Sequence, residues 1–184
     1  MNRIINKNEI EIKIKIVLQP LIEEDIKIFS KWLDKEYIGK WFGEKEHWLY
    51  ELNNRNGKYN FMKNFIVCHN DKKIGYCLYC DCFFLKNLEE NAYNASFLKD
   101  LYGDITEENN TYEIGYLIGE EEYLNKGIGK IIIQKLEEKI IEIGGKELSA
   151  DPSEDNIISI KALLSNGFKK KNDGDYRKIL KRIY

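Results

Sequence analysis

The stretch of sequence that decides the fold is Leu124-Asn125-Lys126-Gly127-Ile128-Gly129-Lys130. Its two glycines lie between a predicted strand, Tyr112 to Ile118, and a predicted amphipathic helix, Gly127 to Ile143. Glycines let successive backbone N–H groups turn toward one point at the positive end of a helix dipole, which is a common way to hold a diphosphate. The stretch therefore predicts a site for a phosphate-bearing cofactor.

Two better-known phosphate loops do not fit these residues. A P-loop needs an earlier glycine, and Ser or Thr after the Gly-Lys pair, where this chain has Leu124 and Ile131. The dinucleotide-binding fingerprint needs a third glycine, where this chain has Ile132, and belongs to an N-terminal βαβ unit. A glycine-rich helix start without any ligand remains the alternative, because Gly-x-Gly often matches by chance.

The sequence after the long helix continues in a regular order. Lys146 to Ala150 reads as a strand, residues 151–156 as a loop ending in a helix cap, and Ile157 to Leu164 as a helix closed by Asn166-Gly167. This order resembles the GNAT superfamily of acyl-CoA-dependent N-acetyltransferases. The residues that carry the resemblance are Gly127, Gly129, Asn156 and Gly167-Phe168.

A more specific resemblance is to the aminoglycoside 6′-N-acetyltransferases. It is carried by Trp41-Phe42-Gly43-Glu44, by the Leu-x-Lys-Gly-x-Gly form of the loop, and by Asp151-Pro152-Ser153. The resemblance covers most of the chain and is densest from Tyr112 to Phe168. It implies an α+β fold, also describable as three-layer α/β, with a central mixed, mostly antiparallel sheet flanked by helices.

Length and composition fit one such domain. The 184 residues contain no linker, repeat or low-complexity tract, so we expect a single domain over residues 1–184. The net charge of −2 and pI of about 5.9 give no footprint for nucleic acid. No apolar run approaches the ~20 residues of a membrane span, and the N-terminus lacks a signal-peptide core, so a cytoplasmic location is expected. Acidic clusters favour a cationic partner, or are simply a solvated surface.

Further elements follow from hydrophobic periodicity. Alternating or β-rich runs predict five more strands: Glu11 to Val17, Asn64 to Cys68, Lys73 to Phe84, Phe168 to Lys171 and Tyr176 to Ile183. The second and third of these are predicted to form one hairpin, and the last two another. Helical spacing predicts helices over Ile22 to Leu33 and Glu44 to Leu52. The segment from Asn87 to Asn110 is polar and acidic, and reads as a long loop suited to a substrate-facing lid.

The cysteines and histidines give little support to other chemistries. Cys77 and Cys80 lie on one predicted strand and point to opposite faces, so they do not favour a zinc site, and no metal is predicted. Buried cysteines in a reducing compartment are the expected state. His47 and His69 have no Ser or Cys partner in a recognisable nucleophile motif, which argues against a hydrolase triad.

The resemblance implies acetyl-CoA as co-substrate and assigns residues to it. Backbone groups near Leu117 and Ile118 would pair with the pantetheine arm, and the Asn156 side chain would contact the cofactor, cap its helix, or do both. Many superfamily members carry Arg or Gln where this chain has Leu124, so that position offers only its amide. The pyrophosphate would be held by the amides of Asn125, Lys126, Gly127, Ile128, Gly129 and Lys130.

Acetyl transfer to an amine needs a base, because an alkylammonium with a pKa near ~10.4 has no free lone pair. Glu113 is the predicted catalytic base, since a carboxylate among apolar neighbours can be tuned toward that task. The alternative is an exposed strand residue facing solvent. The aminoglycoside-modifying relatives carry Asp at the position aligned with Gly115, which lies on the same strand face as Glu113.

The acid and the acceptor site are less defined. Many members place a tyrosine acid where this chain has Leu163, so Tyr176, Tyr123 or solvent would protonate the leaving thiolate. Asp151 matches the residue that contacts a substrate amine in the aminoglycoside group, but Asp before Pro is also a turn opener. An aromatic wall and an ion pair are predicted from Trp41, Phe42 and Glu44, with a core position as the alternative for Trp41; Asp104 and Asp173 are further acidic candidates.

Three functions remain open on sequence. The first is acetylation of the 6′-amine of an aminoglycoside, a resistance function. The second is the same chemistry on a protein N-terminus, a polyamine or a siderophore precursor, because Glu113-Ile114-Gly115-Tyr116 also looks like the strand of ribosomal-protein N-acetyltransferases. The third is a non-catalytic acyl-CoA-binding module. The expected partner is a small cationic amine, with monomer and homodimer both open.

Overall fold

The computed structural model describes residues 15–88, 95–171 and 174–181, which form one mixed sheet with helices on both faces. The strand order is β1-β2-β3-β4-β5-β7-β6, and neighbouring strands are antiparallel except β4 and β5, which are parallel. The predicted mixed, mostly antiparallel sheet is confirmed. The strands are β1 Ile16–Pro20, β2 Met62–His69, β3 Lys72–Asp81, β4 Thr111–Ile118, β5 Glu147–Ala150, β6 Lys169–Lys170 and β7 Tyr176–Ile179.

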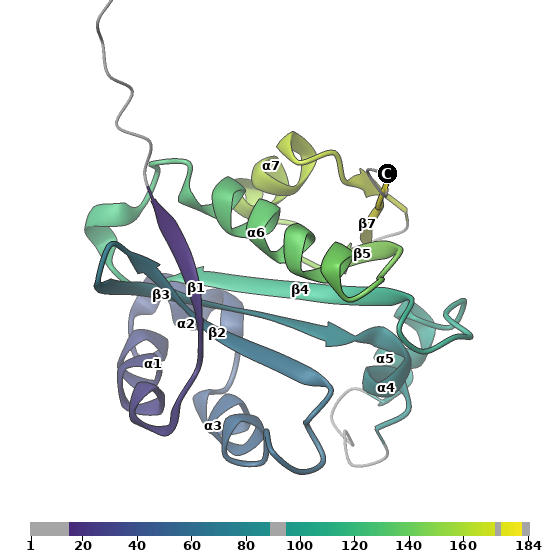
Figure 1. The fold of residues 1–184 in the computed structure, drawn as a ribbon, viewed down its shortest axis with the longest axis horizontal. Helices are drawn as coiled ribbons and strands as arrows, with labels where there is room; N and C mark the ends of the chain where they lie inside the picture. Colours follow the sequence, from purple (N-terminus) through teal and green to yellow (C-terminus); the bar gives the residue numbers. More distant parts are fainter. Residues whose placement is uncertain (1–14, 89–94, 172–173, 182–184) are drawn as a thin grey trace, which may run out of the picture.

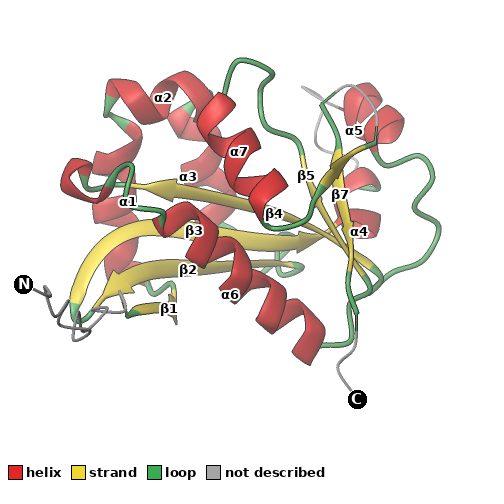
Figure 2. Ribbon diagram, turned by 90° about the horizontal axis from the view of Figure 1, so that it is seen from above, coloured by secondary structure: helices red, strands yellow, loops and turns green. Residues whose placement is uncertain are grey.

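Helices cover the two faces of the sheet in separate groups (Figure 1). One face carries α1 (Ile26–Leu33), α2 (Glu36–Phe42) and α3 (Lys45–Asn53), and the other carries α6 (Ile128–Glu142) and α7 (Ile157–Ser165). Figure 2 shows α6 and α7 side by side over the strands. Two short helices, α4 (Cys82–Lys86) and α5 (Ala95–Leu101), lie together near the end of β3, and 3-10 turns form at Glu23–Asp25 and Glu121–Tyr123.

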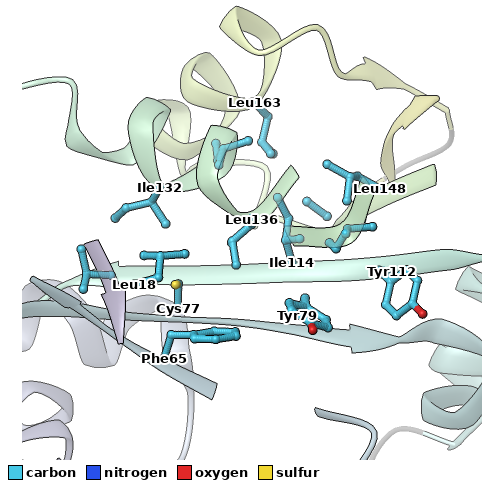
Figure 3. Packing of buried hydrophobic residues seen from close by; sticks show 14 of the residues in the cluster. Leu18, Phe65, Cys77, Tyr79, Tyr112, Ile114, Ile132, Leu136, Leu148 and Leu163 are labelled. Carbon is cyan, nitrogen blue, oxygen red and sulfur yellow. The ribbon is translucent and has the colours of Figure 1, made fainter. Parts of the chain in front are cut away.

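The core on the α6 side is apolar throughout (Figure 3). Ile132 and Leu136 of α6 are fully buried and point toward the sheet, where Phe65 and Cys77 meet them. Cys80, three residues further along β3, belongs to the core on the opposite side. The prediction that Cys77 and Cys80 face opposite ways is therefore confirmed, as strand alternation requires.

Most predicted elements form, but the strand predicted over Lys73 to Phe84 is too long. It ends at Asp81, whose carboxylate accepts a hydrogen bond from the Phe83 amide at 2.8 Å and so caps α4. The other oxygen of that carboxylate accepts from the Asn109 amide at 2.6 Å. The capping hydrogen bond of Asp81 thus starts the helix α4 within a run of residues that strand propensity assigned to a strand.

Three further predictions needed correction. The first strand is Ile16–Pro20 rather than Glu11 to Val17, and residues 11–14 lie outside the described residues. The helix predicted over Ile22 to Leu33 begins as the 3-10 turn and becomes α-helical at Ile26. Part of the predicted loop between Asn87 and Asn110 is the helix α5, and α2 was not predicted at all.

The parallel strands β4 and β5 stay paired over a short distance only. Their register runs from Thr111 opposite Glu147 to Glu113 opposite Ser149, whereas β4 continues to Ile118. Beyond Glu113, β4 keeps β3 as its neighbour and has no recorded partner on its other edge among the described residues. The sheet therefore opens at Glu113. None of the described helices is both long and apolar enough to cross a bilayer.

Candidate active site

The loop before α6 presents backbone donors that the protein does not use. Asn125 and Gly127 both have left-handed backbone angles, with φ of 59° and 73°, and Gly127 stands at the N-cap without a side-chain cap. Within the described chain no acceptor is recorded for the amides of residues 125–130. The first amides of a helix have no intrahelical acceptor, so this loop is a ready anion site.

The second glycine of the loop is required by close packing rather than by its backbone angles. A Cβ on Gly129 would lie 2.9 Å from the Tyr116 hydroxyl of β4, so any larger residue would displace that ring. A Cβ on Gly127, in contrast, would meet nothing within 4 Å, but its positive φ disfavours a side chain. The two glycines thus serve different needs in the same turn.

Asn156 caps the helix α7. Its side-chain oxygen accepts a hydrogen bond from the Ser159 amide at 3.2 Å, so the helix-cap interpretation is confirmed. The proposed cofactor contact of the same side chain stays a prediction. The side chains of Leu117 and Ile118 contribute to the cores on opposite faces, and the Ile118 carbonyl accepts a hydrogen bond from the Tyr37 hydroxyl at 3.3 Å. The proposed pantetheine contact of their backbone stays a prediction.

A cavity of about 520 Å³ opens on the α3 side of the sheet, beside the point where β4 and β5 separate. It is open to solvent on one side and combines carboxylates with aromatic and apolar walls. Its lining residues come from α2, α3, α4, α5, the link between α2 and α3, and four strands or their ends. The residues important for the argument are Phe42, Glu44, Trp48, Glu51, Glu113 and Asp151.

Two carboxyl groups meet at the inner end of this cavity. Glu113 from β4 and Asp151, directly after β5, lie within hydrogen-bonding reach of each other. The Tyr102 hydroxyl, which is fully buried, donates a hydrogen bond to Glu113 Oε2. Because two like charges in contact repel, the pair favours holding one proton between them.

The pKa values of both carboxyl groups are raised. Burial raises the pKa of Glu113 well above its usual range, and the neighbouring charge of Asp151 raises it further, against the opposing hydrogen bond from Tyr102. Burial likewise raises the pKa of Asp151, and its hydrogen bond to Glu113 acts in the opposite direction. Paired carboxyl groups with raised pKa values in a cavity are typical of proton-transfer sites.

A row across the sheet explains why Glu113 is held in place. The register sets Met62 beside Cys80, Cys80 beside Glu113, Glu113 beside Ser149, and Ser149 beside Arg177. Adjacent strands are ~4.8 Å apart, so these five side chains share one face at contact distance. The candidate base therefore stands in the middle of a continuous cross-strand row.

The far end of this row is a buried charge network. The Arg177 Nε lies 2.8 Å from both Asp175 oxygens, its Nη1 lies 3.0 Å from Glu147 Oε2, and its guanidinium lies 5.7 Å from the centre of the Tyr102 ring. Ser149 donates to Asp175 at 3.1 Å. Tyr102 thus connects the charge network to Glu113, because its ring contacts Arg177 while its hydroxyl bonds the carboxylate.

The opposite wall of the cavity contains a further buried carboxylate, that of Glu51. Glu51 on α3 is 8% exposed, and its Oε1 lies 3.1 Å from the His47 Nε2 one turn earlier. Burial raises the pKa of Glu51, and the neighbouring imidazole opposes that rise. Aromatic rings of Trp48 and Phe42, with centres 5.3 Å apart, stand beside this pair.

Only some of the residues predicted to bind the acceptor line the cavity. Asp151, Phe42 and Glu44 line the cavity, whereas Trp41 is absent from the lining and lies under the Lys40 ammonium at 4.1 Å. Asp104 bonds Lys171 and lies 3.6 Å from Arg177, so its charge is compensated away from the cavity. Asp173 lies outside the described residues.

The candidate acids do not reach the cavity either. Tyr176 is buried in the α6-side core, and the Tyr123 hydroxyl lies 3.2 Å from His69 Nδ1. Leu163, where many superfamily members carry tyrosine, is fully buried core. None of these three residues is therefore assigned as the acid that protonates the leaving thiolate.

Sequence reasoning missed Tyr102, Glu51 and the role of Arg177. A signal for Tyr102 was present, because Leu98, Leu101, Tyr102 and Ile105 repeat at helical spacing inside the segment taken as a loop. Glu51 lay in a correctly predicted helix, but nothing local distinguishes a cavity-facing glutamate from a solvated one. Arg177 is remote in sequence from every partner except Asp175, so only the folded sheet reveals its network.

A parallel strand pair that separates beside a glycine-rich helix start, with a carboxylate at the fork, defines an acyl-CoA-dependent N-acetyltransferase. The model of the acetyltransferase (GNAT) family matches residues 26–168, and the chain belongs to that family. Binding of acetyl-CoA or CoA follows from this membership. None of the curated proteins matches the sequence.

Solved structures with the same fold include several N-acetyltransferases. An aminoglycoside acetyltransferase, AAC(6')-Ib, in complex with coenzyme A and kanamycin is 16% identical, with a TM-score of 0.70 over 90% of this chain and 95% of that chain. An aminoglycoside N(6')-acetyltransferase from Legionella pneumophila is 12% identical (TM-score 0.64; 92% and 94% covered). The N-acetyltransferase PseH of Campylobacter jejuni is 20% identical (TM-score 0.54; 91% and 99% covered). At these identities the likeness concerns the fold alone.

Proposed function

We propose that this acetyltransferase transfers the acetyl group of acetyl-CoA to a primary amine, and that the amine is the 6′-amino group of an aminoglycoside. The observation that carries the proposal is the Glu113–Asp151 carboxyl pair at the fork of β4 and β5, inside a cavity large enough for an aminosugar ring. The fold likeness to aminoglycoside acetyltransferases, one of them solved with kanamycin, is additional support for the acceptor.

The residues of the opening fit acetyl-CoA. The amides of residues 125–130 have no recorded acceptor within the described chain, which suits a pyrophosphate at the start of α6. Beyond Glu113, β4 pairs with no strand on its β5 side among the described residues, which suits the amides of a pantetheine arm, because an extended chain can bond a free strand edge. An arm lying along that edge leads from the loop toward Glu113.

Glu113 is proposed as the base and Asp151 as its partner. Because the pKa of Glu113 is raised, it differs less from the pKa of the incoming ammonium, and the proton transfer from the ammonium to the carboxylate becomes less unfavourable. The neutral nitrogen can then attack, while Tyr102 holds Glu113 Oε2 in place. Acetyl-CoA supplies a thioester whose C–S bond breaks as the C–N bond forms, and the proton taken from the amine is released to the thiolate or to solvent.

Release of free thiol tests the proposal directly. Purified protein with acetyl-CoA and kanamycin or tobramycin is expected to release thiol rapidly. Release with other amines only would replace the aminoglycoside by a different acceptor. Coenzyme binding without turnover for any amine would instead indicate a binding module.

The base assignment makes a sharper prediction. Glu113→Gln should lower turnover by a factor of order 10² or more, because it removes the proton acceptor. The rising limb of the wild-type pH–rate profile should lie above the usual range for glutamate, since the base acts only when deprotonated and its pKa is raised. Glu108→Gln, which removes an exposed carboxylate shortly before β4, is the matched control and should change neither quantity. A Glu113→Gln enzyme with an unaltered pH–rate profile would exclude Glu113 as the base.

A further inference from the structure

The acceptor cavity has carboxylates on two separate walls, and the proposed chemistry uses only one of them. Glu113 and Asp151 come from the sheet, whereas Glu51 on α3 and Glu44, directly before α3, come from the layer that covers it. The charges of Glu51, Glu113 and Asp151 act on the thiol of Cys80, which lines the same cavity on β3. Because both carboxylate positions line one cavity of about 520 Å³, a single small molecule that fills the cavity can reach both.

Glu51 is a buried carboxylate whose hydrogen-bonding partner, His47, is exposed to solvent. Its side chain is 10% exposed, whereas that of His47, its recorded side-chain partner within the described chain, is 47% exposed. The charge of Glu51 also raises the pKa values of three neighbouring groups, Tyr59, Tyr76 and Cys80. None of these three groups can carry a positive charge. A buried carboxylate among neutral groups is stabilised when a cation binds it.

The walls between the two carboxylate positions suit an organic cation rather than a metal ion. Trp48 and Phe42 line the cavity with aromatic rings, a residue type whose faces attract ammonium groups and whose carbon surface suits the chain between two amines. Met62 and Leu78 add apolar surface on the sheet side. A molecule with amines at both ends of an apolar or sugar framework matches this arrangement.

We propose that Glu51 binds a second ammonium group of the acceptor, so that the enzyme selects diamines and larger polyamines over monoamines. This inference rests on the proposed function, because it concerns the same cavity. It adds that the amine which does not react contributes most of the selectivity. In this arrangement the reacting amine lies at Glu113 and Asp151, and the remote amine displaces or joins His47 at Glu51.

The test compares α,ω-diamines of increasing length with n-alkylamines of the same length as acceptors. Glu51→Gln should raise the KM of the best diamine about tenfold or more, the loss expected for a charged hydrogen bond, and leave kcat and the monoamine KM nearly unchanged. It should also abolish the dependence of KM on diamine length. Glu46→Gln, which removes an exposed carboxylate from the same helix, is the control and should change none of these values.

Two further measurements keep the outcome decisive. Calorimetric binding of the best diamine without acetyl-CoA should weaken by a similar factor in Glu51→Gln, and Glu51→Asp, which keeps the charge, should shift the preferred diamine length upward. Equal losses for monoamines and diamines, or unchanged diamine binding in Glu51→Gln, would overturn the inference. The proposed function fails separately: its aminoglycoside acceptor fails when kanamycin and tobramycin release no thiol, and acetyl transfer itself fails when no amine does, whatever the binding data show.

Discussion

The two faces of β4 differ sharply in what they bury. Toward α6 the strand presents Tyr112 and Ile114 to an apolar core that is filled by isoleucine and leucine (Figure 3). Toward α3 it presents Glu113 and Gly115 to an open cavity flanked by buried charge. One strand thus serves a packed face that holds the fold together and a hollow face that carries carboxylates.

The two faces of β4 show that one side of a strand can contribute packing while the other side carries polar groups. Close packing on the α6 side fixes the backbone of β4, and on the other face the Tyr102 hydroxyl and the cross-strand row hold the Glu113 side chain. A buried carboxyl pair is unfavourable by itself, because desolvation and like-charge repulsion both oppose it. The carboxyl pair therefore depends on compensation by Arg177 and on stability supplied by the apolar cores on both faces of the sheet.

The largest effect is expected where charge compensation is removed. Arg177→Met should lower the free energy of unfolding by about 3–5 kcal/mol, because Asp175, which is 0% exposed, would keep an uncompensated charge. Denaturant titration measures this loss. Lys178→Met on the same strand, which breaks a partly exposed pair with Glu137, should cost only about 0–1 kcal/mol. Similar losses for both variants would mean that the buried network adds nothing special to the polar face.

A second comparison tests the two faces with the same substitution. Leu136→Ala on the packed face should cost about 2–5 kcal/mol, because Leu136 is fully buried and its removal leaves a cavity. Leu78→Ala should cost less, since Leu78 already borders the open cavity and loses fewer contacts. Equal costs in denaturant titration would contradict the distinction between a filled and a hollow face.

The smallest effect concerns the stability of Glu113→Gln. An acid whose pKa is raised on folding contributes stability below its unfolded pKa of about 4.3, and that contribution is lost as the pH rises through the folded value. Glu113→Gln should therefore be modestly more stable than the wild type at neutral pH, with the difference vanishing in acid. Thermal unfolding between pH 4 and pH 8 measures it. A variant that is less stable at neutral pH would show that the carboxylate is well compensated.

The parts of the fold that were predictable are those with strong local signals. The glycine loop, the helix after it and the strand before it were placed within a residue or two, because glycine conformation and hydrophobic periodicity act over short distances. Misplaced boundaries, such as that at Asp81, reflect a single capping hydrogen bond that overrides strand propensity. The helix α5 was missed because its apolar repeat is short and lies within polar residues.

The candidate site was predictable in part. Glu113 and Asp151 were chosen for separate roles, and the fold brings them into contact as one pair. Tyr102 and Arg177 were not chosen, because their partners lie on other strands and helices. Trp41 was expected with Phe42 and Glu44, but a helix turns successive side chains by about 100°, and only the latter two line the cavity.

The sequence by itself determined the family, the glycine-rich turn before α6 and the strand that carries Glu113, because each depends on residues that are neighbours in the chain. Tertiary structure alone decided that Glu113 shares its surroundings with Asp151 and Tyr102, and that Glu51 faces them from another layer. The physical reason is that pKa values, charge pairing and cavities depend on distances in space, which sheet register and helix packing set and local sequence does not.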